Sequence, residues 1–66
     1  VHVTMRIEPN DTVVIRAFDD VPEHLFRVSE VHDDCVSGVA LSGPLKGEYG
    51  EPELTLVLRV HSRAEG

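Results

Sequence analysis

The sequence contains only one cysteine, Cys35, and this scarcity bears on both stability and location. A single thiol cannot form a disulfide within the chain, so these 66 residues lack the covalent cross-links that stabilise many small domains. A domain of this size buries only about 60% of the surface of its unfolded chain, which leaves little stability to spare. A lone thiol is typical of a reducing compartment, and we predict a cytoplasmic location.

Long apolar runs and basic residues are also scarce. The longest apolar runs, such as VVI at 13–15 and LVL at 56–58, are far shorter than the roughly 20 residues that span a bilayer. Six lysines and arginines are scattered among twelve acidic residues, which gives a formal net charge of −6. Nucleic acids and anionic membranes are bound through clustered basic side chains, so we expect neither as a partner.

Aromatic residues number three, namely Phe18, Phe26 and Tyr49, and tryptophan is absent. A cage for methylated lysine needs several converging rings, and Phe26 has the pattern of a core residue, so we do not expect a complete cage. Tyr49 lies in a loop at 43–53 that is rich in glycine and proline. That loop is the most plausible recognition feature of the sequence.

Alternation of apolar and polar residues, the pattern of half-buried strands, dominates the chain. Strands are predicted at 2–8, 12–18, 25–31, 35–42 and 54–61. The residues predicted to point inward on the first, second and last of these are Val3, Met5, Ile7, Val13, Ile15, Ala17, Leu54, Leu56, Leu58 and Val60. Those predicted to point outward include Val14, Phe18, Thr55, Val57, Arg59 and His61.

Two turns and one helical turn separate these strands. The segment PND at 9–11 predicts a turn, because proline fixes φ and Asn or Asp bonds its own backbone. Asp20 precedes Glu23 by three residues and Pro22 lies between them, which predicts a short helical turn with a capping box. The segment VHDDCVSG at 31–38 predicts the turn of a hairpin.

In that hairpin, a two-residue turn at Asp33–Asp34 places His32 and Cys35 opposite each other. Asp-Asp suits such turns less well than Asp-Gly, so a longer or bulged turn stays open. Two registers are compatible with the pattern. With a bulge at Ser29–Glu30, the inner face comprises Val28, Val31, Val36, Gly38 and Ala40. Without it, the apolar face comprises Phe26, Val28, Cys35, Val39 and Leu41, and we favour this second register.

Five short strands and one helical turn predict an all-β fold, either a small five-stranded SH3-like barrel or a strongly bent antiparallel sheet. We expect a single domain over residues 1–66, ordered from about residue 2 to 61 and frayed at 62–66. The string PNDTVVIR, the hairpin around EVHDDCVSG and the final apolar strand resemble small SH3-like barrels of the Tudor or KOW type. The resemblance spans most of residues 9–61 and rests on strand pattern, and such barrels bind many kinds of partner.

Four histidines offer further chemistry, and all are predicted at outward or loop positions: His2, His24, His32 and His61. In SH3-like barrels the first and last strands pair, which would make His2 and His61 neighbours able to bind a metal or respond to pH near about 6. Fraying of the ends is the simpler interpretation.

The candidate metal ligands are His32, Asp33 and Asp34, which residues of the loop at 19–24 would complete. Zinc sites normally use about four ligands in paired spacings, and neither usual spacing occurs here. We therefore interpret this segment as a solvated turn. Binding of a metal ion or small ligand there is the alternative function.

Cys35 as a nucleophile would need a lowered pKa, a base such as His32 or His24, and a cleft. A free cysteine more often behaves as a small buried hydrophobe, so we predict no catalytic residue and no cofactor. An oligomeric enzyme with its active site between subunits stays open.

The leading hypothesis is a small, non-enzymatic protein-interaction or oligomerisation module. Its candidate partner-binding residues are Val14, Phe18, Val57 and Tyr49, because apolar side chains gathered on an outer face usually mark an interface. We expect the partner to be a second copy of the chain or another protein. Burial of that face would also stabilise a domain with a small core.

Overall fold

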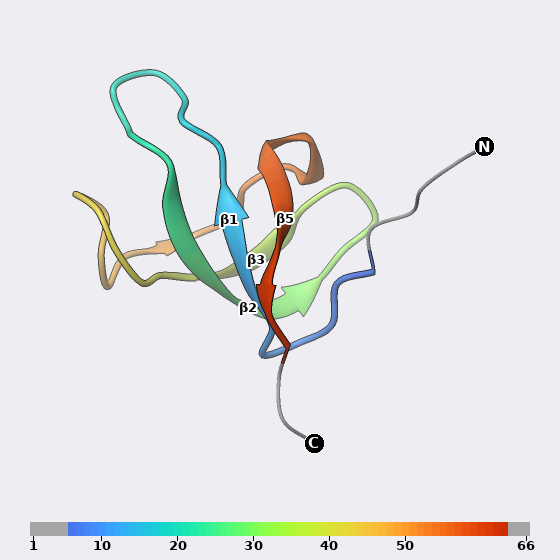
Figure 1. Cartoon of the computed structure of the whole chain (residues 1–66). Helices are drawn as coiled ribbons and strands as arrows, with labels where there is room; N and C mark the ends of the chain where they lie inside the picture. The colour runs from blue at the N-terminus through green and yellow to red at the C-terminus, as the bar shows by residue number, and fades with distance from the viewer. Residues whose placement is uncertain (1–5, 64–66) are drawn as a thin grey trace.

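The computed structural model describes residues 6–63, which form one antiparallel sheet of five strands (Figure 1). In chain order the elements are β1 (Thr12–Ile15), β2 (His24–Val31), β3 (Val36–Ala40), β4 (Tyr49–Gly50), the 3-10 turn η1 (Leu54–Leu56) and β5 (Val57–Ser62). The strand order is β4-β3-β2-β1-β5, so β1 lies in the interior of the sheet between β2 and the last strand. The prediction of an all-β fold with one short helical turn is confirmed for this range.

The sheet is strongly bent but does not close into a barrel. Register shifts interrupt the pairing of β1 with β5 and of β2 with β3, and such bulges increase local twist and bending. The bending brings Cys35, just before β3, into bridge pairing with Glu53, just before η1. The edge strands β4 and β5 do not pair with each other. Of the two predicted shapes, the bent sheet is therefore the correct one.

The hairpin of β2 and β3 contains a bulge, one of the two alternatives that were compatible with the alternation of apolar and polar residues. Val28 pairs with Gly38 and Glu30 with Ser37, so Ser29 is the extra residue on β2. The bulge turns one side of β3 inward, and its buried members are Val36, Gly38 and Ala40. Val39 and Leu41 are only half-buried, and the register without a bulge, which we favoured, is wrong.

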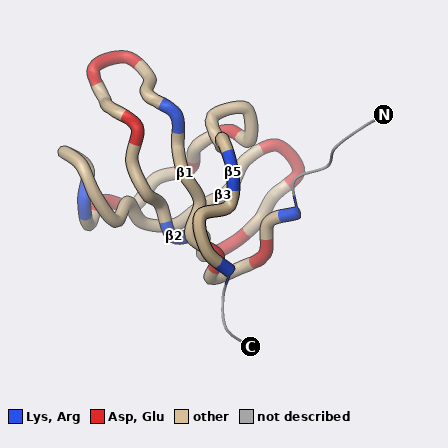
Figure 2. Tube along the Cα trace, viewed as in Figure 1, with Lys and Arg blue, Asp and Glu red and all other residues tan. Residues whose placement is uncertain are grey.

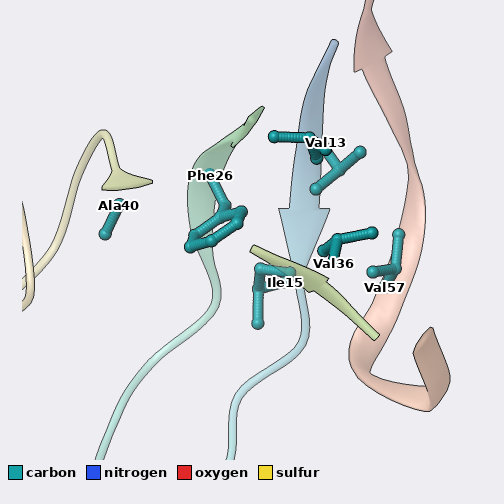
Figure 3. Packing of buried hydrophobic residues seen from close by; sticks show 7 residues of the cluster. Val13, Ile15, Phe26, Val36, Ala40 and Val57 are labelled. Atoms are coloured by element: carbon teal, nitrogen blue, oxygen red, sulfur yellow. The ribbon is translucent and has the colours of Figure 1, made fainter. Parts of the chain in front are cut away.

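The hydrophobic core is small and is formed by side chains of β1, β2, β3 and β5 (Figure 3). Its buried members are Val13, Ile15, Phe26, Val28, Val36, Ala40 and Val57, and the half-buried side chains packed against them are Ile7, Phe18, Leu54, Leu56 and Val60. The alternation of β1 supplies Val13 and Ile15 to this core, as predicted. Ala17, predicted to point inward as well, follows the end of β1 and is exposed.

Val14 is buried although the alternation predicts an outward position for it. It is 3% exposed but does not belong to the core cluster. On the interior strand β1 it pairs with Leu25 of β2 on one side and Arg59 of β5 on the other. Cross-strand neighbours on the same face lie close enough for long side chains to cover a valine between them. The prediction that Val14 is exposed is therefore wrong.

The expected helical turn after Asp20 is also absent. Phe18 and Val21 instead exchange two backbone hydrogen bonds, of 2.9 and 2.7 Å, around the pair Asp19–Asp20. Asp19 has a φ of 47°, and aspartate is among the few non-glycine residues that adopt this left-handed conformation readily. A tight reversal therefore replaces the capping box, and the helical turn of the described chain lies at η1.

The 3-10 turn η1 changes the phase of the final apolar segment. A 3-10 turn has three residues per turn, whereas a strand repeats every two, so the alternation does not run through Leu54–Leu56 into β5. Val57 becomes a core residue at 6% exposure, and Leu58 points outward at 43%. The predicted orientations of Val57 and Leu58 are thus reversed.

The segments that flank the sheet differ from the predictions as well. Within the strand predicted at 2–8, residues 2–5 lie outside the described range, and residues 6–8 form no strand. Ile7 nevertheless packs against the core. The predicted turn at PND is confirmed, with Asn10 at a φ of 74°. At the other end, β5 continues to Ser62, and Arg63 is hydrogen-bonded where we expected fraying.

Candidate binding cavity

The loop between β1 and β2 forms the first wall of a cavity. The reversal at Asp19–Asp20 returns the chain so that Phe18 faces His24, and their ring centroids are 6.3 Å apart. His24 is buried, and its Nδ1 lies 2.8 Å from the Pro22 carbonyl oxygen. Because a carbonyl oxygen only accepts, Nδ1 carries the proton. The prediction of an outward or loop position for His24 is wrong, since it is the first residue of β2 and its side chain is buried.

The segment between β3 and β4 forms the second wall, and it is closely hydrogen-bonded. The Gly47 and Glu48 amides donate to the carbonyl oxygens of Ala40 and Leu45, each at 2.8 Å. Gly47 has a φ of 85°, a conformation that favours glycine. The turn thereby fixes the start of β4, and Tyr49 extends from a defined position rather than from a loose loop.

Between these walls lies an open cavity of about 400 Å³, a size typical of ligand sites. All three aromatic residues of the chain line it: Phe18 from the first wall, Phe26 from β2 and Tyr49 from β4. Phe26 is buried, Phe18 is half-buried and Tyr49 is 65% exposed. The remaining lining residues are His24, Ala40, Leu45, Glu48, Gly50, Glu51, Pro52, Glu53 and Leu56. Aromatic side chains from three separate elements thus converge on one concave site.

Three carboxylates belong to the cavity lining, together with the His24 ring. Glu48, Glu51 and Glu53 are exposed, and among residues 6–63 no lysine or arginine lines the cavity. Tyr49 Oη donates to Glu51 Oε2 at 3.2 Å, which ties an aromatic ring to one of these carboxylates. Figure 2 shows further acidic residues along the loop after β1. The cavity therefore combines aromatic surface with negative charge.

The four predicted partner-binding residues do not share one surface. Phe18 and Tyr49 both line the cavity, whereas Val57 belongs to the core and Val14 is buried on β1. The outer apolar patch that motivated the grouping therefore does not form. The sequence did not single out Glu48, Glu51 and Glu53, although the acidic segment EYGEPE at 48–53 contains all three. Their convergence with Phe18 depends on the bend of the sheet.

The hairpin tip at 32–35 does not line this cavity, although Cys35 pairs with Glu53, which does. The loop at 19–23 precedes β2, and the hairpin tip follows it. Because a strand of eight residues extends about 3.3 Å per residue, the loop and the tip lie at opposite ends of β2. They therefore do not form a joint metal site. Among residues 6–63, no three side chains of His, Cys, Asp or Glu are grouped closely enough to hold a metal. His32, Asp33 and Asp34 are exposed.

His32 also contacts a serine and a glutamate, but not in the arrangement of a catalytic triad. Its Nε2 lies 3.3 Å from Ser37 Oγ and 3.7 Å from Glu30 Oε1. A triad uses opposite ring nitrogens for the nucleophile and the orienting carboxylate, whereas one nitrogen faces both groups here. Ser37 is also 2% exposed, so a substrate would not reach its hydroxyl.

Cys35 is half-buried beside acidic side chains. The His32 amide donates to its carbonyl oxygen at 2.8 Å, so His32 and Cys35 do face each other across Asp33–Asp34. Partial burial raises the pKa of the Cys35 thiol, and the carboxylates of Asp34, Glu51 and Glu53 raise it further. A thiol held protonated in this way is a poor nucleophile.

Comparison of this chain with protein-family models, with curated proteins and with solved structures finds no match. Across residues 6–63, no helix has the length and apolar character needed to cross a membrane. The interpretation of function therefore depends on the cavity and its chemistry.

Proposed function

We propose that this protein is a non-enzymatic interaction module that binds a segment of a partner protein in the cavity between the β1–β2 loop and the Leu45–Leu56 segment. The observation that supports this most strongly is the convergence of Phe18, Phe26 and Tyr49 on one open cavity. Exposed tyrosine at a concave, partly apolar site is typical of recognition surfaces, because it gives large contact area at low cost in side-chain entropy.

Two arrangements outside the cavity speak against catalysis. The His32 ring presents one nitrogen to both of its side-chain neighbours, and the raised pKa of Cys35 disfavours the thiolate. The single thiol also supports the cytoplasmic location that we propose.

Selection from a random peptide display library tests this function. Wild-type protein serves as bait, and counter-selection against Tyr49→Ala removes peptides that bind elsewhere. We expect enriched peptides that perturb the amide NMR signals of cavity residues and lose binding to Tyr49→Ala. Tyr49 is 65% exposed and does not belong to the core cluster, so this variant should keep the fold. If no enriched peptide depends on the cavity, the proposed function is wrong.

Self-association is a second candidate, with a different surface from the one the sequence suggested. Within residues 6–63, β5 pairs only with β1, and Leu58 on this edge strand is exposed. An unpaired strand edge is a template for pairing with another chain. Sedimentation of wild type and Leu58→Lys over a range of concentrations tests it: a mass that stays monomeric in wild type excludes this candidate.

A further inference from the structure

We infer that the cavity accepts an arginine side chain presented by a basic segment of the partner, an inference that rests on the function proposed above. The negative charge of the cavity favours a cationic side chain. Glu48, Glu51 and Glu53 line the cavity, and among residues 6–63 no lysine or arginine does. An apolar or anionic ligand would take these carboxylates out of water without a partner, which is costly, whereas a cation compensates them.

Aromatic rings and carboxylates lie side by side in the cavity, a combination that favours a cation able to contact both. Tyr49 and Glu51 are hydrogen-bonded neighbours, and Phe18 lines the same cavity. A cation that contacts both an aromatic ring and a carboxylate gains a cation–π interaction as well as charge-assisted hydrogen bonds. Lone carboxylates would attract any cation, but the rings favour one with a flat, weakly hydrated face.

The shape and hydration of the two basic side chains distinguish arginine from lysine as the occupant. The guanidinium is planar, stacks on aromatic rings and presents several N–H donors in one plane, whereas the ammonium of lysine is a strongly hydrated point charge. Three glutamates at different positions around the cavity match the multiple donors of one guanidinium. A volume of about 400 Å³ admits a long side chain together with part of the adjoining peptide.

The test uses the cavity-directed peptides from the display selection, whose arginine is replaced by citrulline or by lysine. Citrulline keeps the shape and removes the charge. We expect citrulline to weaken binding at least about tenfold and lysine to weaken it severalfold, measured by fluorescence anisotropy. Glu51→Gln/Glu53→Gln should weaken the arginine peptide by about tenfold and reduce its salt dependence.

A matched variant separates local from global charge. Glu23→Gln/Glu30→Gln removes the same two charges from glutamates that do not line the cavity, and it should leave binding nearly unchanged. Thermal unfolding of both double variants establishes that each is folded. Glutamine at position 51 still accepts the Tyr49 hydrogen bond, so the ring position is preserved.

The outcomes distinguish this inference from the proposed function. Cavity-directed peptides that lack arginine, or that bind equally with citrulline, overturn the inference and leave the interaction module standing. Tighter binding of the lysine peptide, or equal losses in the two double variants, also overturns it. If no peptide depends on Tyr49, both the function and the inference are wrong.

Discussion

Asp11 and Arg63 join the two ends of the described chain, with Asp11 Oδ2 lying 3.0 Å from Arg63 Nη1. The Asp11 side chain is 2% exposed and also accepts the Glu8 amide at 2.9 Å. The same arginine nitrogen donates to the Arg6 carbonyl oxygen at 2.6 Å. Because a buried carboxylate needs such partners, this pair fastens the segment before β1 to the end of β5.

Replacement of Arg63 by glutamine should therefore destabilise the protein. The loss removes the charged partner of a buried carboxylate, and we expect about 1–2 kcal/mol, reduced by the partial exposure of the arginine. Urea unfolding measures it. Arg6→Gln is the matched control, since it breaks an exposed ion pair with Glu8 and should change stability by less than about 0.5 kcal/mol. Equal effects of the two variants would contradict the role given to Asp11.

Substitution of Gly38 should be far more damaging than substitution of Gly50, its partner across β3 and β4. A Cβ at Gly38 would overlap the Arg27 carbonyl oxygen and lie 3.1 Å from Phe26 Cε2, whereas at Gly50 the nearest atom is Phe26 Cε1 at 3.9 Å. We expect Gly38→Ala to cost at least about 2 kcal/mol and Gly50→Ala less than about 1 kcal/mol. Similar melting temperatures for both variants would rule out this packing.

The final strand offers a direct test of its phase. Val57→Ala removes core volume and should cost about 2 kcal/mol, whereas Leu58→Ala, on the exposed side, should cost less than about 0.5 kcal/mol. Denaturant unfolding of both variants measures the difference. The reverse order would restore the orientation that simple alternation predicts.

The thiol of Cys35 should lose its proton at a higher pH than the thiol of an unfolded chain does. Its pKa is raised in the folded state, so the folded protein holds the thiol proton more tightly than the unfolded chain does. The resulting stabilisation is fully present below the unfolded pKa of about 8.5 and is lost as pH rises through the higher folded pKa. Urea unfolding across this alkaline range should show wild type losing stability relative to Cys35→Ser.

The rate of Cys35 alkylation provides the second readout, with a midpoint above about pH 8.5. Asp34→Asn should lower this midpoint, because the Asp34 carboxylate raises the pKa both by its charge and by a hydrogen bond. Asp33→Asn is the control of equal charge and should have a smaller effect. A midpoint at or below that of an unfolded peptide would contradict the arrangement.

The alternation of apolar and polar residues predicted those parts of the fold that depend on residues close together in the sequence. The β2–β3 hairpin joins segments that are adjacent in sequence, and its turn at Asp33–Asp34 follows from the alternation on either side. The prediction failed where a short irregularity resets the period, as η1 does before Val57. It failed again at Val14, since burial on the outer face depends on which strands flank β1.

The cavity could not be predicted from the sequence pattern, because it is formed by residues that are distant in the chain. Phe18 and Tyr49 are far apart in the chain, and the sequence places one at the end of a predicted strand and the other in a predicted loop. Their meeting depends on the left-handed turn at Asp19 and on the hydrogen-bonded turn before β4. Bulges and tight turns of this kind carry little signal in a single sequence, although they decide which surfaces converge.

The placement of β5 beside β1 has a consequence for synthesis. β1 is made early but acquires its second neighbour only when residues 57–62 have been made, because those residues form β5. Val57, a core member, and Arg63, the partner of Asp11, arrive equally late. On the ribosome, the emerging chain can therefore form the β2–β3 hairpin but not the completed sheet. Until β5 emerges, the nascent chain exposes one edge of β1 to chaperones and to other chains.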